Sequence, residues 1–258
     1  MGQDGLSLAF EAMPRGTRLD QALVQRGHFA TRQQAQTAIM AGEVEINGRR
    51  AAKPSDLVRE ETQISVATRN RFVGRGGIKL EGALTHFGIS SADKVALDIG
   101  ASTGGFTDCL LQNGARKVFA VDVGHGQLAW KIRQDPHVIV LEKINARHLS
   151  RAQIPEPIDL CVIDVSFISV TLILPNAFEL LTPNGVILAL IKPQFELARE
   201  DVGRGGIVRE PALHERAQRK VSDFARQMGA NVIGLAPSII AGADGNREFF
   251  LCLQKPSD

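Results

Sequence analysis

The chain lacks any apolar run that approaches the ~20 residues needed to cross a bilayer. Its first residues, MGQDGLSLAFEAMPRG, also lack a basic stretch followed by an apolar core. Leu6 stands where a myristoylation signal needs Ser or Thr. These absences argue against a membrane-spanning, exported or lipid-anchored protein, and we expect a cytoplasmic location.

Cysteine is also scarce, since the chain has three, Cys109, Cys161 and Cys252. They lie far apart among apolar neighbours, without a CxxC pair or a nearby histidine. This pattern predicts buried thiols in a reducing compartment, and it provides no ligand set for a metal.

The net charge of +2 conceals an uneven distribution along the 258 residues. Residues 14–75 carry eleven Lys and Arg against six Asp and Glu, a net of +5, so the remainder sums to −3. A basic module on a weakly acidic body is expected when one part of a protein holds a polyanion and another part acts on it. The length fits one medium domain with a small appendage.

The basic module has the pattern of two short helices and a β-hairpin. Leu19 and Leu23 recur at helical spacing before a natural stop at Gly27. Thr31 is a good N-cap for a second helix over RQQAQTAIMAG. The stretch EVEINGRR then alternates apolar and polar residues and turns at Asn-Gly, which predicts a hairpin.

Residues 18–54 resemble the S4 RNA-binding domain in their Arg-Leu-Asp opening, their capped second helix and their GEVEING hairpin. The resemblance implies a small α+β RNA-binding domain at 14–66, followed by a linker at 67–77. Because the segment has few aromatics, its stacking on bases should be weak. The domain should instead recognise the shape of the RNA and bind its phosphates. A solvated basic surface without a ligand is the alternative. The candidate RNA-binding residues are Arg15, Arg18, Arg32, Arg49, Arg50, Lys53, Arg71 and Arg75.

From residue 78 onward, strand-like and helix-like stretches alternate. The apolar runs suit strands buried on both faces, and they fall at 94–100, 117–123, 137–142, 158–167 and 185–193. Helical stretches separate them, including one over GHGQLAWKIRQD. This alternation predicts an α/β fold with a Rossmann-like, mostly parallel sheet over 78–255. Two further strands at the end lack an intervening helix, so the last strand should be antiparallel.

The first strand ends in a glycine-rich turn, ALDIGASTGGFTDCLLQN, which enters a helix. Ligands of open parallel sheets bind beyond the carboxyl ends of the strands, near such a turn. Gly100, Gly104 and Gly105 let the chain turn sharply and let a ligand approach the backbone. Asp98 could meet a cationic amino group, and Asp122, ending the second strand, could meet a ribose. These features favour S-adenosylmethionine over NAD, and glycines required only for packing are a further alternative.

Further stretches resemble the TlyA (hemolysin A) family, whose members join an S4 domain to an FtsJ-like ribose methyltransferase domain. They are DIGASTGGFTD, VDVGHGQL, DVSFIS, IKPQFE and NREFF, and the resemblance runs from about Arg18 to Leu253. It implies 2′-O-methylation of cytidine in ribosomal RNA within ribosomal subunits, with S-adenosylmethionine as cofactor. We infer no obligate protein partner from the sequence. The implied cofactor-binding residues are Asp98, Gly100, Ser102, Gly104, Gly105, Phe106, Asp122 and Asn145.

The family's Lys-Asp-Lys-Glu catalytic tetrad matches Lys79, Asp164, Lys192 and Glu248. Asp164 and Lys192 end the fourth and fifth predicted strands, so both should reach the cleft beside the glycine turn. We expect Lys192 to deprotonate or orient the ribose hydroxyl, with Asp164 placing it. A lysine accepts a proton only when burial or nearby positive charge lowers its pKa, and Lys79 could supply that charge. Lys79 and Glu248 would position ribose and phosphate.

Other functions fit the sequence less well. Amino-group methylation usually shows an Asn/Asp-Pro-Pro-aromatic motif, whereas the fourth strand ends in Asp-Val-Ser-Phe. Cytosine C5 chemistry needs a nucleophilic Cys, and Cys161 lies inside an apolar strand. A catalytically silent assembly factor would need a broken tetrad, and a haemolysin would need a membrane-active segment. The loop at 194–210 either contacts RNA or is solvated.

Overall fold

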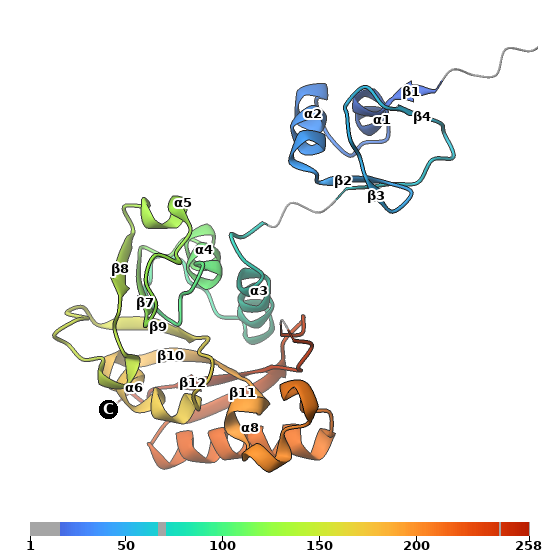
Figure 1. Cartoon of the computed structure of the whole chain (residues 1–258). Coiled ribbons are helices and arrows are strands. Elements are labelled where there is room, and N and C mark those ends of the chain that lie inside the picture. The colour runs from blue at the N-terminus through green and yellow to red at the C-terminus, as the bar shows by residue number, and fades with distance from the viewer. Residues whose placement is uncertain (1–15, 67–70, 243, 258) are drawn as a thin grey trace, which may run out of the picture. The chain divides into compact units, whose positions relative to one another are not determined.

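The computed structural model describes residues 16–66, 71–242 and 244–257, and it divides into two compact units at residues 69 and 70 (Figure 1). Arg15, one of the expected RNA-binding residues, lies outside the described residues. No helix within these ranges is long and apolar enough to cross a membrane. Each unit is described below by itself.

The first unit is a small α+β domain built on helices α1 and α2. Its elements are β1 (Thr17–Arg18), α1 (Leu19–Gln25), α2 (Arg32–Ala41), β2 (Val44–Ile46), β3 (Arg49–Arg50), β4 (Leu57–Val58) and β5 (Ile64–Val66). Thr31 caps α2 in a capping box with Gln34, as its position predicted. Strand β2 pairs with β3 and β5, and a core containing Leu19, Leu23 and Ile39 joins the helices to the strands.

The second unit is built on a seven-stranded sheet in the order β11-β12-β10-β9-β6-β7-β8. Strands β6, β7, β8, β9 and β10 are parallel, and β12 is antiparallel to both of its neighbours, as expected for the last strand. The strands are β6 (Val95–Ile99), β7 (Lys117–Asp122), β8 (Val138–Glu142), β9 (Ile158–Ile163), β10 (Leu181–Ile191), β11 (Asn231–Pro237) and β12 (Phe249–Gln254).

Helices cover both faces of this sheet, as the alternating sequence predicted (Figure 1). On one face, α3 (Gly76–Phe87) and α4 (Gly105–Gln112) bury Leu80 and Leu110 against the strands. On the other face, α6 (Leu174–Leu180) and α8 (Pro211–Gln227) bury Ala177 and Val221. The shorter helices are α5 (Trp130–Arg133), α7 (Pro193–Glu196), η1 (Ala146–His148), η2 (Val170–Leu172), η3 (Arg199–Asp201) and η4 (Arg204–Gly206).

Three strand ends meet where the strand order reverses beside β6. The Asp164 N–H donates to the Ile99 carbonyl at 2.9 Å, and the Gly100 N–H donates to the Val121 carbonyl at 2.9 Å. Gly100 has a φ of +88°. A Cβ there would lie 2.3 Å from the Asp164 carbonyl oxygen. Only glycine therefore fits this junction, which sits at the usual ligand-binding position of the fold.

Two local expectations differ from the structure. The helix expected over GHGQLAWKIRQD contracts to α5, because the Gly124 and Gly126 N–H groups bond to Asp122 at 2.6 Å and Glu142 at 2.9 Å and hold the chain in turns. The later part of the expected linker packs onto the second unit, since Phe72 is buried against Gly77 of α3.

Candidate active site

An ion pair between Lys192 and Asp164 stands at the carboxyl ends of β10 and β9. Lys192 Nζ lies 2.6 Å from Asp164 Oδ1 and donates a hydrogen bond of 2.8 Å to Ser166 Oγ. Both paired side chains are mostly buried, with 11% and 19% of their surface exposed. The two strands are adjacent and parallel, so their ends bring these residues together as the sequence predicted.

A second buried ion pair joins Lys79 to Glu248. Lys79 Nζ on α3 donates to Glu248 Oε2 at 2.5 Å, across 169 positions of sequence. Lys79 is 8% and Glu248 4% exposed. Glu248 is not on an exposed edge, because it leads into β12, which β11 covers on its outer side. The charge that we expected Lys79 to lend to Lys192 is therefore paired with Glu248.

Three cavities surround these pairs. The largest, about 470 Å³, runs from Gly100 past Asp122 and Asn145 to Asp164. A small one of about 150 Å³ joins Gly76, Gly105 and Asp164. A third, of about 400 Å³, contains Lys79, Lys192 and Glu248 together. Ser166 and Phe167 line both the first and the third cavity, so the site has two neighbouring compartments.

The first cavity has the chemistry to hold a nucleoside. Apolar side chains of Ile99, Val121 and Ile144 form walls suited to a base. Asp122 accepts hydrogen bonds from the Ser102 N–H at 2.7 Å and the Gly124 N–H, and each carboxylate oxygen retains capacity for a ribose hydroxyl. Asn145 Oδ1 accepts from the Arg147 N–H at 3.1 Å, and both residues line the cavity.

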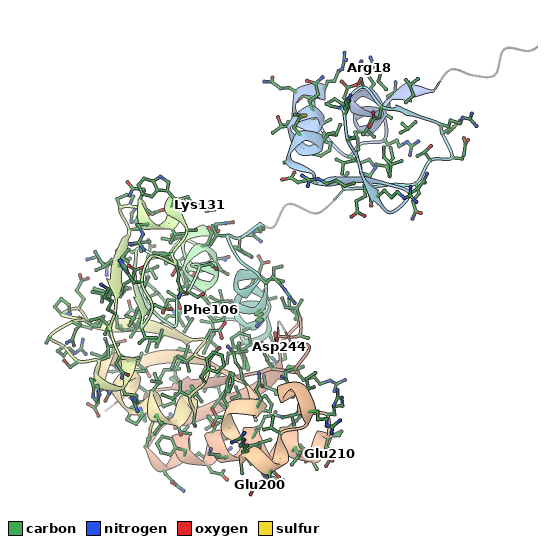
Figure 2. All side chains as sticks on the ribbon, in the orientation of Figure 1. Arg18, Phe106, Lys131, Glu200, Glu210 and Asp244 are labelled. Carbon is green, nitrogen blue, oxygen red and sulfur yellow. The ribbon has the colours of Figure 1, made fainter. Side chains whose placement is uncertain are left out.

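The small cavity is shaped by glycines that face one another. A Cβ on Gly105 would lie 3.0 Å from the Gly77 nitrogen and 3.2 Å from the Gly74 carbonyl oxygen. Gly104, the N-cap of α4, has a φ of +93° and lies against Leu128. Phe106 lines this cavity, but its ring stacks on Phe250 in the core, and Figure 2 places it inside the second unit. The first cavity suits the nucleoside end of a ligand such as S-adenosylmethionine, and the small cavity suits its amino-acid end.

Asp98 takes a different position from the expected one. Its side chain is fully buried and is not among the residues that line these three cavities. Thr107 Oγ1 donates to Asp98 Oδ2 at 2.6 Å, while Oδ1 is buried without a hydrogen-bond partner among the described residues. In this structure Asp98 is held by Thr107 of α4, directly after the glycine turn, and its second carboxylate oxygen is unpaired within the described part of the chain.

Asp98 should make stability depend on pH. Burial raises the pKa of Asp98 from 3.8 to about 7. The hydrogen bond from Thr107 lowers this pKa by a smaller amount, and the charge of Asp164 raises it further. Between these values the folded protein holds a proton that the unfolded chain releases, so this contribution to stability is lost as pH rises from about 4 to about 7. Asp98→Asn, which keeps the shape of the protonated group, should remove that slope.

Urea unfolding of the wild type and Asp98→Asn at pH 5 and pH 8 measures this difference. From pH 5 to pH 8, the free energy of unfolding of the wild type should fall by on the order of 2–3 kcal/mol more than that of the variant. Equal pH slopes in the two proteins would show that Asp98 is ionised in the fold.

Several residues of the site were not expected from the sequence. Ser166 contacts Lys192 directly, and its position two residues after Asp164 in DVSF is the signal that could have identified it. Thr107, the third residue of α4, donates a hydrogen bond to Asp98. Asn246 forms part of the third cavity and bonds to both Val208 and Gly206 of the loop after Lys192.

The three cysteines are buried and unpaired, as expected. Burial raises the pKa of Cys109 to about 12 and of Cys252 to about 11, and it raises the pKa of Cys161 well above its usual value. A thiol with such a pKa is a poor nucleophile at neutral pH, so the fold does not favour cytosine C5 chemistry on these residues.

The expected RNA-binding residues fall on both units. The first unit contains five of them: Arg18, Arg32, Arg49, Arg50 and Lys53. Arg50 donates a hydrogen bond to the Ala41 carbonyl. The side chains of Arg18 and Arg32 are about half exposed. Arg71 and Arg75 belong to the second unit. Arg71 pairs with Glu81, and Arg75 donates to the Ala241 carbonyl at 3.2 Å.

Comparisons with known proteins match both units. The FtsJ-like methyltransferase model matches residues 72–255, and the S4 domain model matches residues 17–64. A candidate rRNA methyltransferase of Bacillus subtilis, YqxC, is 48% identical over 243 residues, covering 93% of this chain and 86% of that protein. The 16S/23S rRNA (cytidine-2′-O)-methyltransferase TlyA of Mycobacterium tuberculosis is 44% identical over 248 residues, which cover 95% of this chain and 92% of that protein. The solved structure of a candidate hemolysin from Streptococcus thermophilus is 45% identical and has a TM-score of 0.73. The match covers 96% of this chain and 90% of that chain.

Proposed function

The chain belongs to the FtsJ-like methyltransferase family, in the S4-bearing TlyA (hemolysin A) branch, and on that premise we propose that it methylates a ribose 2′-hydroxyl of ribosomal RNA. The observation that carries this proposal is the Lys192–Asp164 pair, which stands between a nucleoside-sized cavity and a second cavity containing Lys79 and Glu248. The first compartment would hold S-adenosylmethionine, and the second would receive the target ribose.

S-adenosylmethionine supplies an electrophilic methyl group when it is bound. Asp122 and Asn145 would hold its nucleoside end, while Ser102 and the Gly100 and Gly105 backbone would surround its amino-acid end. Gly104 does not line either cavity, and it would serve by turning the chain into α4. Asp98 and Phe106 would keep the glycine turn in shape from the core side.

The residues of the third cavity would prepare the hydroxyl. Lys192 would orient the 2′-hydroxyl or receive its proton, and the contacts with Asp164 and Ser166 fix Lys192 Nζ for that task. When a methyl group is transferred to the ribose oxygen, the hydroxyl proton would pass to Lys192 if Lys192 is the neutral amine. If Asp164 keeps Lys192 as the ammonium, Lys192 would orient the oxygen and the proton would leave to water. Lys79 and Glu248 would hold the ribose and its phosphate from the opposite wall.

The S4 unit would tether the RNA. Its basic residues, together with Arg71 and Arg75 on the second unit, would bind phosphates in a way that does not depend on sequence. We propose cytidine in ribosomal subunits as the target, by analogy with the TlyA of Mycobacterium tuberculosis, and hence a cytoplasmic location.

Methyl transfer to ribosomal subunits tests this function. Purified protein, labelled S-adenosylmethionine and subunits that lack the modification should yield labelled rRNA. Cofactor binding without transfer to either rRNA would favour a silent RNA-binding assembly factor instead. Lysis of erythrocytes in a parallel assay would support the activity for which the hemolysin relatives are named.

A further inference from the structure

The first unit contains a buried carboxylate, Asp20, that no part of the proposed chemistry uses. Its side chain has no exposed surface, although it lies in the first turn of α1 in a small basic domain. A buried carboxylate is costly unless it is fully paired, so its partners indicate what it is for.

Asp20 accepts four hydrogen bonds from three side chains. Arg18 donates through Nε to Oδ1 at 3.2 Å and through Nη2 to Oδ2 at 3.1 Å. Arg32 donates through Nε to Oδ2 at 3.0 Å, and Gln36 through Nε2 to Oδ2 at 2.7 Å. Arg32 and Gln36 are four residues apart on α2 and therefore point the same way. The carboxylate thus joins β1, α1 and α2 at one point.

The two arginines extend from this buried anchor to the surface. Their side chains are 40% and 49% exposed, and Figure 2 shows Arg18 at the surface of the first unit. Asp20 accepts only the Nε–H of Arg32. Among the described residues, no other side chain or carbonyl accepts a hydrogen bond from the terminal nitrogens of that guanidinium. Those N–H groups remain available for an anion such as phosphate, two of whose oxygens an arginine fork can bind with parallel hydrogen bonds.

We infer that Asp20 is a positioning residue for RNA: it fixes the Arg18 and Arg32 guanidinium groups side by side as a preformed receptor for backbone phosphate. This inference rests on the proposed RNA-modifying function. Fixing two long side chains before binding removes part of the entropy cost that free arginines would have when they meet a phosphate.

The inference predicts a result opposite to that of simple charge attraction. Asp20→Asn removes a negative charge from the RNA-binding unit, so an unstructured basic surface would bind RNA more tightly. If Asp20 acts by positioning, the variant should bind about 5–10-fold more weakly, and the slope of log K against log salt should shrink by about 1. Glu61→Gln is the matched control, because it makes the same charge change at an exposed position of the same unit.

The test measures binding of the full chain to a labelled RNA hairpin at several salt concentrations, with thermal unfolding of each variant in parallel. A double-mutant cycle with Arg32→Ala adds the pairwise coupling, and the Asp20→Asn effect should become smaller in that background. Weaker binding by Asp20→Asn beside unchanged or tighter binding by Glu61→Gln supports the inference. Binding by Asp20→Asn as tight as that of the wild type, or tighter, overturns it.

A second variant covers the case in which Asp20→Asn does not fold. Arg32→Lys keeps the charge but loses the Nε–H donor that Asp20 holds. A several-fold loss of affinity supports the inference, and unchanged affinity overturns it. A wild-type chain that transfers methyl groups to rRNA but shows no salt-dependent binding to the hairpin would overturn the positioning role alone. A wild type that neither binds nor methylates RNA would also remove the proposed function.

Discussion

Replacing Lys192 with alanine is expected to lower kcat for methyl transfer by about a thousandfold, because the ribose hydroxyl would lose the group that orients it or takes its proton. Lys192 Nζ is held by Asp164 at 2.6 Å and by Ser166 at 2.8 Å, and the variant would leave the partly buried Asp164 carboxylate without its cation. Lys192 lines the third cavity and not the nucleoside cavity. The dissociation constant for S-adenosylmethionine should therefore stay within about twofold of the wild type.

Single-turnover methylation and equilibrium titration of the cofactor measure the two effects separately. Lys94→Ala is the matched control, since it removes a lysine outside all three cavities and should leave both values unchanged. If Lys192→Ala turns over at a rate near that of the wild type, Lys192 does not have the assigned role. If it loses the cofactor as well, its role is in building the fold of the site.

Gly100→Ala is expected to weaken cofactor binding by at least a hundredfold and to lower the free energy of unfolding by about 2–4 kcal/mol. The new Cβ would lie 2.3 Å from the Asp164 carbonyl oxygen, so the ends of β6 and β9 would have to separate beside the nucleoside cavity, which Gly100 and Asp164 line. The movement would also displace Asp164 from Lys192, and methyl transfer should fall with cofactor affinity.

The matched control separates the steric conflict from the backbone conformation. Gly229 has a φ of +85°, close to that of Gly100, but a Cβ there would meet no atom within 4 Å. Gly229→Ala should therefore cost about 1 kcal/mol of stability and leave cofactor affinity unchanged. Equal effects of the two substitutions would mean that the junction of β6 and β9 tolerates a side chain.

The sheet could be predicted from the sequence because the central parallel strands, β6, β9 and the second half of β10, are buried on both faces and are therefore mostly apolar. The pairing of Asp164 with Lys192 could be anticipated for a related reason, since both end strands whose carboxyl ends share one edge of a parallel sheet. The capped helix after Thr31 was equally local, because its capping box involves residues three positions apart.

Other features depend on contacts that a local pattern does not contain. The burial of Glu248 follows from β11 lying outside β12, which is a matter of strand order, and its pairing with Lys79 spans 169 positions. Asp98 was expected at the ligand because it precedes the glycine turn, but its side chain points to Thr107 in the interior. In the sequence, Asp20 is one of several acids in a basic segment. Only the fold shows that its carboxylate pairs with both Arg18 and Arg32.

The position of the transferred methyl group is the measurement that tests the account most directly. Labelled rRNA from the transfer reaction should be digested to nucleosides, and the label should appear in a 2′-O-methylated nucleoside at one mapped position. Replacing that nucleotide with its 2′-deoxy form in a reconstituted substrate should abolish transfer there. Label on a base, or transfer that survives the loss of the 2′-hydroxyl, would contradict the assignment of Lys192 and Asp164 to ribose chemistry.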